Sequence, residues 1–247
     1  MKLISLNVEG HKHHERVFPF LEKEDADVLC LQEASMEHGN KLEALGYDVA
    51  FTPRCIMKQN DKEFEEGILL ASKHPFTHKT YYYYKNSEAI PPEGFDESLG
   101  RKADHQCFIF AEIECGDDTY HIATNHFTWT PDGATPNKEQ IDDMEVFLEL
   151  VDTLPSHVMC GDFNVPRYHN SLYEKLMLHY KDTVPQQYKS SLDKQLHRIG
   201  ENPEKSIIFE SFMVDYVFTQ SPYIAKDVRL EFNISDHAGV VCEIVKT

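Results

Sequence analysis

Short apolar segments of strand length are distributed along this chain between segments with helical periodicity. Residues 27–32 form a nearly continuous apolar run, and residues 157–160 form a second one. A strand without a polar side is typical of a sheet that is covered on both faces. The alternation of such strands with helices therefore predicts an α/β fold, with two α/β halves whose sheets face inward and whose helices lie outside.

Periodicity and the residues that end helices predict the remaining elements. We expect strands at residues 2–6, 27–32, 47–51, 67–72, 77–84, 106–115, 119–126, 157–160, 213–218, 228–232 and 239–245. Helices are expected at residues 15–23, 36–45, 136–153 and 170–180. Gly46 would end the second helix and Thr135 would cap the third. Pro19 fits the first helix only within its first turn. Residues 85–105, which include Gly100, and residues 181–210 are expected to form loops.

The charge balance argues against a groove for long nucleic acids. The chain has 24 Lys and Arg against 42 Asp and Glu, a net charge of −18. Such a charge repels polyanions, and binding along a duplex needs a basic stripe. A phosphorylated substrate is still compatible with this charge, because bound metal ions invert the field locally. We expect the protein to bind a short substrate at one site rather than to track along a duplex.

Length and cysteine content indicate the class of protein. The 247 residues fit one domain with a substantial core, residues 1–247, and no apolar run reaches the roughly 18 residues of a membrane span. Six cysteines occur without a Cys-x-x-Cys spacing, and Cys30, Cys160 and Cys242 lie in apolar runs. Buried free thiols indicate a reducing compartment. We therefore expect a cytoplasmic monomer with no membrane partner.

Carboxylates gather where the predicted strands end. Glu33 and Asp162 follow apolar strands, Asp215 opens another strand, and Asp236 precedes the last one. Each residue alone is more often part of a turn, a cap or a solvated corner. Four carboxylates at one sheet edge, however, would repel one another and would need cations or protons. Oxygen ligands without thiolates suit Mg²⁺ or Mn²⁺ rather than structural Zn²⁺.

Six short motifs resemble those of the endonuclease/exonuclease/phosphatase superfamily, in the same order and over nearly the whole chain. The motifs are Leu6-Asn7-Val8-Glu9-Gly10, Leu31-Gln32-Glu33, Thr124-Asn125-His126-Phe127, Gly161-Asp162-Phe163-Asn164, Val214-Asp215-Tyr216-Val217-Phe218 and Ser235-Asp236-His237. The resemblance implies a four-layer α/β/β/α sandwich, in which two mixed sheets pack face to face with helices outside. It also implies hydrolysis of phosphoesters with a divalent metal ion.

The resemblance implies a metal site and a site for the attacking water. Glu33 would be the main metal ligand, with Asn7 beside it and Asp236 near the ion. Asp162 and Asn164 would orient the nucleophilic water and contact the phosphate.

The same resemblance implies roles for two histidines. His237 would contact the scissile phosphate or act as base, with Asp215 fixing its tautomer. His126 would stabilise the transition state or protonate the leaving group. The residues do not decide which imidazole is the acid and which the base.

Four further residues are candidates for substrate binding. Arg101 could hold a phosphate, and Trp129 could stack on a base or ring or else anchor its loop. His197 and Arg198 could line the substrate side. His11, His13 and His14 are expected to lie in a solvated loop.

The substrate class stays open at this stage. Nucleic-acid ends or short single strands are the first possibility, and a phospholipid or phosphosugar head group is the alternative. A third possibility is a relative that binds metal or protein without catalysis. The motif residues are all present, and their presence favours the enzyme.

Overall fold

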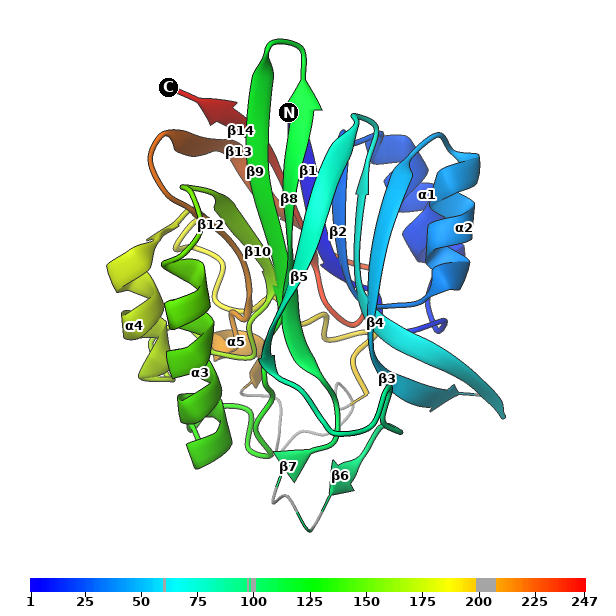
Figure 1. Ribbon diagram of the computed structural model, residues 1–247, viewed down its shortest axis with the longest axis vertical. Coiled ribbons are helices and arrows are strands. Elements are labelled where there is room, and N and C mark those ends of the chain that lie inside the picture. Colours follow the sequence, from blue (N-terminus) through cyan, green and yellow to red (C-terminus); the bar gives the residue numbers. More distant parts are fainter. Residues whose placement is uncertain (60, 97, 99–100, 199–207) are drawn as a thin grey trace.

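Two six-stranded sheets pack face to face in the middle of the molecule (Figure 1). The computed structural model describes residues 1–59, 61–96, 98, 101–198 and 208–247. The first sheet has the order β13 (Tyr223–Glu231), β14 (Gly239–Lys246), β1 (Lys2–Asn7), β2 (Val28–Ala34), β4 (Lys62–Ser72) and β3 (Asp48–Gln59). The second has the order β11 (Lys181–Asp182), β12 (Asp215–Thr219), β10 (Val158–Asp162), β9 (Asp118–His126), β8 (Gln106–Cys115) and β5 (Phe76–Tyr84).

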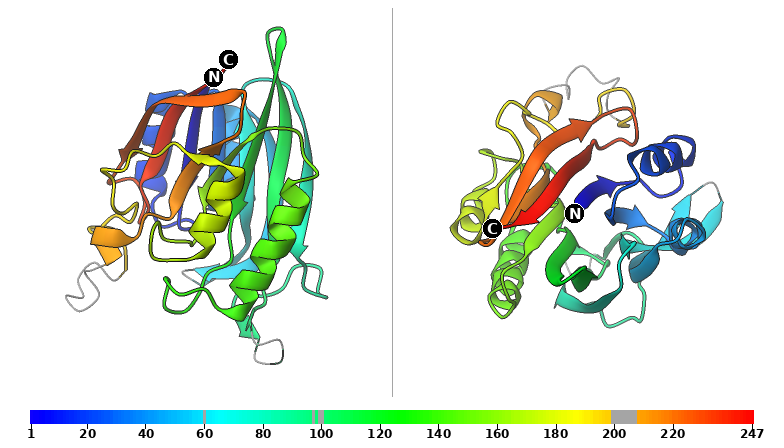
Figure 2. Two further views of the ribbon diagram at one scale, coloured as in Figure 1. Left: turned by 90° about the vertical axis from the view of Figure 1, so that its left-hand side faces the viewer. Right: turned by 90° about the horizontal axis from the view of Figure 1, so that it is seen from above.

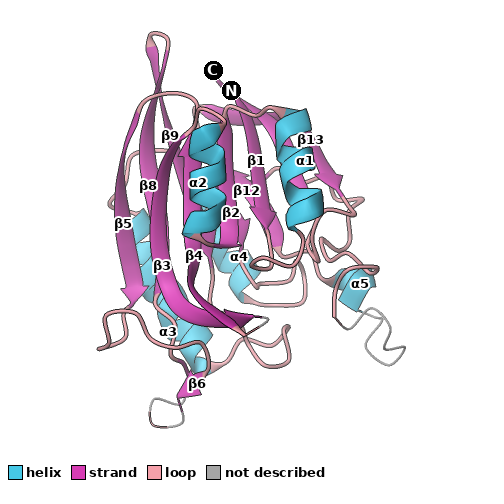
Figure 3. Ribbon diagram, turned by 90° about the vertical axis from the view of Figure 1, so that its right-hand side faces the viewer, coloured by secondary structure: helices cyan, strands magenta, loops and turns pink. Residues whose placement is uncertain are grey.

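Helices form the two outer layers, which confirms the predicted four-layer sandwich. Helices α1 (His14–Glu24) and α2 (Met36–Ala44) lie side by side over the first sheet (Figure 3). Helices α3 (Lys138–Val151) and α4 (Leu172–His179) cover the second sheet (Figure 2). Among the described residues, no helix is long and apolar enough to cross a bilayer.

The alternation of side chains along the central strands builds two apolar layers. Leu3 and Cys30 face the second sheet, whereas Ile4, Leu29 and Leu31 face α1 and α2. All five are fully buried. Successive strand residues point to opposite faces, so one apolar run serves both layers. The prediction that residues 27–32 are buried on both faces is confirmed for the strand that they form, and all six cysteines are free thiols.

The hairpin of β3 and β4 is longer than predicted. Its ladder continues to the pair Gln59 and Lys62, far beyond the predicted strands at 47–51 and 67–72. The distal part is polar and half exposed, so it lacks the apolar alternation that marks a strand.

The start of the third helix also differs from the prediction. Thr135 is not its cap, because the backbone N–H groups of Ala134 and Thr135 donate to Asp132 Oδ1 in a preceding turn. Asn137 caps α3 instead and accepts from the backbone N–H of Gln140 at 2.9 Å.

Pro19 lies beyond the first turn of α1, contrary to expectation. Pro19 cannot donate to the Glu15 carbonyl, but both residues are exposed and water can hydrate that oxygen.

The predicted loops contain short regular elements. Strands β6 (Phe95–Asp96) and β7 (Arg101–Lys102) pair within residues 85–105, where Gly100 lies outside the described residues. Strand β11 falls within residues 181–210 and helix α5 (Ile208–Ser211) begins there, while residues 199–207 lie outside the described part.

Gly161 allows β10 to approach β9 closely just before Asp162. Its φ is +135°, and a Cβ at this position would lie 1.9 Å from the Asn125 carbonyl oxygen. Only glycine fits both the backbone angle and the space. The Gly-Asp sequence is therefore a packing requirement of the strand that presents Asp162.

His157, directly before β10, is a buried imidazole whose hydrogen-bond partners among the described residues are uncharged. Nδ1 lies 2.8 Å from the Pro155 carbonyl oxygen, and Nε2 lies 2.7 Å from the Tyr180 hydroxyl. Burial lowers the pKa of His157 to about 4. The folded protein therefore keeps this side chain neutral at pH values where the unfolded chain binds a proton.

We predict that this histidine weakens the fold in acid. Below about pH 6.5 the unfolded state binds a proton at this histidine that the folded state does not bind. The free energy of unfolding therefore falls as the pH falls. The contribution is about 2 to 3 kcal/mol between pH 6.5 and pH 4.5. Urea denaturation at both pH values checks this, and His157→Gln should lose less stability than the wild type. Equal acid sensitivity of the two proteins would contradict the assignment.

Candidate functional site

Strand register brings the predicted site residues of the second sheet together. In β10, Asp162 pairs with His126 of β9 on one side and with Asp215 of β12 on the other. The facing sheet brings Asn7 and Gln32 opposite each other at the ends of parallel strands β1 and β2. The ends of these central strands from both sheets therefore meet at one edge of the sandwich.

Asn7 links the two sheets at this edge. Its Nδ2 donates to Glu33 Oε1 at 3.1 Å and to Asp162 Oδ2 at 3.2 Å. A single amide thus contacts two carboxylates that are far apart in sequence.

A bulge in β2 turns Glu33 toward this edge. The ladder with β4 is irregular between Leu31 and Ala34, and Glu33 has a φ of +52°. Left-handed backbone is uncommon for a residue with a side chain, and bulges often redirect a side chain beside an active site. The Glu33 side chain is 25% exposed and faces His126 at 3.9 Å.

Asp162 and Asn164 form a tight turn at the end of β10. The backbone N–H of Asn164 donates to Asp162 Oδ1 at 2.9 Å, and its side chain donates to the Phe127 carbonyl at 2.9 Å. The two residues therefore form an Asx turn. It also fixes Asp162, which leaves Oδ2 beside Asn7.

Asp215 and His237 form a buried hydrogen-bonded pair. His237 Nδ1 lies 2.8 Å from Asp215 Oδ2 and 3.9 Å from Asp162 Oδ2. Burial alone would lower the pKa of His237, but the two carboxylates outweigh it and raise the pKa well above its usual value. The carboxylates therefore favour the protonated form of His237, whose Nδ1 is hydrogen-bonded to Asp215.

Residues 190–193 support this pair, and they were not predicted as part of the site. Ser191 Oγ accepts from the backbone N–H of Val214 and Asp215 at 3.1 and 3.2 Å. The backbone N–H of Asp193 donates to the Asp236 carbonyl at 2.7 Å. One loop thus fixes the two segments that carry Asp215 and His237.

Glu9 and His13 lie beside Asp236, and they were not predicted as site residues. The three side chains offer ligand atoms within 4.8 Å of one another, and His13 Nε2 lies 2.9 Å from Glu9 Oε2. Glu9 is placed by a turn in which its N–H donates to Asn7 Oδ1. The expectation that His11, His13 and His14 lie in a solvated loop is wrong, since His13 is 9% exposed and the other two are half-buried.

Crowded carboxylates give this edge the donor set of a hard cation site. Burial raises the pKa of Asp162 to about 7, and Asp215 adds to the rise. Burial also raises the pKa of Asp236 to about 7, helped by Glu33 and Glu9. Asp215 Oδ1 is buried without a hydrogen-bond partner among the described residues. Like charges without enough donors fit a divalent cation, which would offset them.

Arg54 sets the state of His126. It is 3% exposed and donates from Nη1 to His126 Nδ1 at 2.6 Å. Because a guanidinium only donates, Nδ1 must accept, so Nε2 carries the proton. That nitrogen faces Asp162 Oδ2 at 3.7 Å and Glu33 Oε1 at 3.9 Å. Burial and the Arg54 charge lower the pKa of His126 well below its usual value.

We predict that His126 is the neutral Nε2–H tautomer because of Arg54. Long-range ¹H–¹⁵N NMR correlation of the imidazole nitrogens reads the tautomer directly. In Arg54→Met the Nδ1 acceptor role is no longer imposed, so the nitrogen shifts of His126 should move toward a mixture of states. Arg16→Met, an exposed arginine, serves as the control. A protonated Nδ1 in the wild type would contradict the assignment.

The four predicted substrate residues are not all brought together: His197 and Arg198 are neighbours in the sequence, and Arg101 and Trp129 belong to other segments. Arg101 pairs with Asp143 and stacks on the Tyr84 ring at 3.4 Å, and Trp129 is 38% exposed beneath Lys102. Arg198 is exposed. The His197 ring lies 6.5 Å from the His237 ring, which places His197 beside the carboxylate edge.

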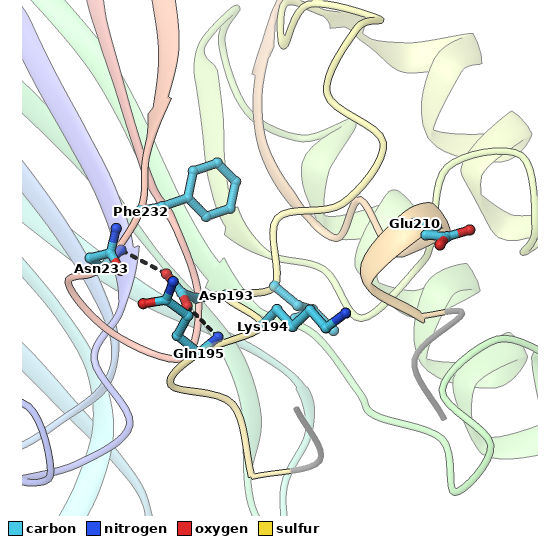
Figure 4. Close-up of a pocket in the computed structure, with 7 residues that line it drawn as sticks. Asp193, Lys194, Gln195, Glu210, Phe232 and Asn233 are labelled. Carbon is cyan, nitrogen blue, oxygen red and sulfur yellow. Dashed lines mark hydrogen bonds between the residues drawn. The ribbon is translucent and has the colours of Figure 1, made fainter. Parts of the chain in front are cut away.

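A shallow pocket lies beside this edge rather than on it. Its volume is about 350 Å³, and it is lined by Leu192, Asp193, Lys194, Gln195, Glu210, Phe232 and Asn233. Figure 4 shows the Phe232 ring on one side and Glu210 on another. The Asp193 backbone bond to Asp236 connects the pocket to the site.

The sequence matches a protein family over almost its whole length. A profile of the Endonuclease/Exonuclease/phosphatase family matches residues 4–237. The chain therefore belongs to the endonuclease/exonuclease/phosphatase family, whose members hydrolyse phosphoester bonds. This confirms the resemblance that the six motifs indicated. Among curated proteins, none matches the sequence significantly.

Solved structures share the fold. The endonuclease/exonuclease/phosphatase from Bacteroides vulgatus has a TM-score of 0.70 and 16% identity, covering 100% of this chain and 98% of that chain. A mannosyl-6-phosphatase from Bacteroides thetaiotaomicron has a TM-score of 0.69 and 15% identity, covering 99% of each chain. The human Nocturnin catalytic domain with bound sulfate has a TM-score of 0.65 and 16% identity, covering 100% and 94%.

Proposed function

We propose that this protein is a phosphoesterase that depends on Mg²⁺ or Mn²⁺. The observation that carries the proposal is the double hydrogen bond of Asn7 to Glu33 and Asp162. It joins carboxylates of two sheets at the edge where His126 and His237 also lie. Hard oxygen ligands beside two imidazoles are suited to attack on phosphorus, which builds negative charge on oxygen.

Glu33, Asn7 and Asp236 would hold the metal ion, and Glu9 adds a carboxylate beside Asp236. When bound, the ion supplies Lewis-acid polarisation of a phosphoryl oxygen. The raised pKa values of Asp162 and Asp236 support a cation at this edge, because burial and the neighbouring carboxylates disfavour their charged forms and a bound cation would offset that effect. The chemistry of the donors does not discriminate between Mg²⁺ and Mn²⁺.

The remaining residues act on the water and the phosphate. Asp162, fixed by its turn with Asn164, would orient the attacking water. His237, kept cationic by Asp215, would donate a hydrogen bond to the phosphate. His126, kept neutral by Arg54, would donate its Nε2 proton toward the developing charge. The two imidazoles thus hold different protonation states before substrate arrives.

The substrate we propose is a nucleic-acid end or a short single strand. Trp129 offers an exposed indole on which a base could stack, with Lys102 above it. Arg101, His197 and Arg198 are the proposed additional contacts. A phosphosugar or phospholipid head group is the alternative, and the fold shared with a mannosyl-6-phosphatase is compatible with it.

A substrate panel tests the function. Short oligonucleotides, sugar phosphates and phospholipid head groups would be assayed with Mg²⁺, with Mn²⁺ and after chelation. We expect metal-dependent hydrolysis with the oligonucleotides fastest. Faster turnover of a sugar phosphate would select the alternative substrate. Metal binding without any hydrolysis would indicate the non-catalytic relative and reject the enzyme.

We predict that metal binding depends on Glu33. Glu33→Ala removes a carboxylate that contacts Asn7 at the cation site, so Mg²⁺ should no longer raise Tm and almost all activity should be lost. Thermal melts across a Mg²⁺ titration measure this. Glu22→Ala, an exposed glutamate on α1, should behave like the wild type. Unchanged Mg²⁺ affinity in Glu33→Ala would reject the ligand role.

We predict that Asp162 and His237 act in the chemical step. Asp162→Asn and His237→Gln should each lower kcat by at least about 100-fold, the lower range for positioned acid–base groups. Tm should rise in Asp162→Asn because like-charge repulsion is removed, and it should fall in His237→Gln because the buried Asp215 loses its cationic partner, so kcat is compared well below the Tm of each variant. The exposed Asp48→Asn is the control. Near-normal kcat in either variant would mean that the site is misplaced.

A further inference from the structure

Three histidines form a compact cluster outside the carboxylate edge. His11 precedes α1, His14 opens α1, and His38 lies in the first turn of α2. Their ring centroids are 4.6 to 5.8 Å apart. One ring nitrogen from each lies within 4.8 Å of the others. His38 is fully buried, so this arrangement is part of the fold rather than a chance meeting of surface side chains.

The His14 and His38 rings face each other through their Nε2 atoms. His14 Nε2 and His38 Nε2 are 3.1 Å apart. Two nitrogens that bind one tetrahedral zinc ion at 2.0 to 2.1 Å lie about 3.3 Å apart. The observed spacing is therefore close to what a shared ion requires.

The second nitrogen of each of these two rings also has a neighbour. His14 Nδ1 lies 3.5 Å from Glu37 Oε1, and ligand histidines typically donate their second N–H to such a carboxylate. His38 Nδ1 accepts from the Ser35 backbone N–H at 3.2 Å in the capping box of α2, so without a metal its Nε2 carries the proton and donates to His14 Nε2. Zinc binding at His38 Nε2 therefore requires the other tautomer, in which Nδ1 donates to Ser35 Oγ at 3.2 Å and the backbone bond opens. His11 Nε2 lies 2.8 Å from Ser35 Oγ, and its ring stacks on Phe64 at 4.0 Å.

We propose that His11, His14 and His38 bind a zinc ion, with Glu37 or water as the fourth ligand. Imidazole ligands in a small tetrahedral set suit Zn²⁺, whereas Mg²⁺ prefers oxygen. The site is separate from the carboxylate edge in its ligands and in its chemistry. Sequence patterns placed His11 and His14 in a solvated loop and did not single out His38, because the contacts join residues that are 24 to 27 positions apart.

The ion would connect two segments that also serve the carboxylate edge. His11 and His14 follow Asn7 and Glu9, and His38 follows Glu33. A zinc ion would therefore tie the chain after β1 to the start of α2 and restrict the positions of both. This is a structural role, and it predicts that zinc raises Tm even with Mg²⁺ in excess.

The test is zinc titration of the chelator-treated full chain in excess Mg²⁺, followed by calorimetry and melting curves. We expect one zinc ion to bind tightly per protein chain. His11→Ala and His14→Ala should each weaken this binding by about 100-fold or more. His13→Ala is the matched control, because it lies in the same segment but contacts Glu9. The exposed His78→Ala controls for loss of any histidine. Both controls should retain the tightly bound zinc ion.

Co²⁺ substitution provides a second measurement. Four-coordinate Co²⁺ absorbs visible light far more strongly than six-coordinate Co²⁺, so strong bands are expected in the wild type and in His13→Ala but not in His14→Ala. Absence of a tightly bound zinc ion would overturn the proposal. Loss of that ion in His13→Ala with retention in His14→Ala would also overturn it, since the ion would then lie at Glu9 and Asp236. Hydrolysis of the substrate panel with Mg²⁺ is measured separately, so either proposal can fail alone.

Discussion

Burial of several carboxylates at one edge is the constraint on which the site depends. Asp162 and Asp215 are each 1% exposed and Asp236 is 7% exposed, while Glu33 lies within reach of the same side chains. Two covered sheets force this crowding, because their central strands end together and water is excluded between them. Isolated buried charges are costly, so the chain surrounds them with donors. Asn7 and His237 supply some of these donors. The carboxylates still have too few donors and too little positive charge around them, and a bound cation would compensate for both.

The same constraint gives two identical side chains opposite properties. His237 faces Asp215 and Asp162, which favour its charged form, whereas His126 faces Arg54, which opposes a second positive charge. Both are buried, so burial does not distinguish them. The difference arises from the neighbouring strands, since β12 presents a carboxylate and β3 presents a guanidinium. Asp162 is thereby flanked by His237, whose surroundings favour the protonated form, and by His126, whose surroundings favour the neutral form.

Local patterns predicted the fold and the motif residues, but not the contacts that tune them. Glu33 and Asp162 follow apolar strands, so a single segment is enough to mark each. Arg54 contacts His126 across 72 positions, and Ser191 contacts Asp215 across 24. The hydrophobic periodicity within one segment does not predict contacts between segments that are so far apart in the sequence. One signal for Arg54 was available: Pro53 interrupts a strand pattern, and the β3 ladder is irregular between Pro53 and Cys55.

The segment after β1 shows how one short stretch can serve two kinds of cation chemistry. Glu9 and His13 contact each other beside Asp236, while His11 and His14 turn to His38. Oxygen ligands predominate on the first side, and imidazoles make up the second. A hard cation would therefore bind the oxygen ligands and a borderline cation the imidazoles. The two sets of ligands separate in space even though they alternate along the sequence. Because Asn7 and Glu33 begin the two segments that the histidines connect, order at the imidazole cluster favours order at the carboxylate edge.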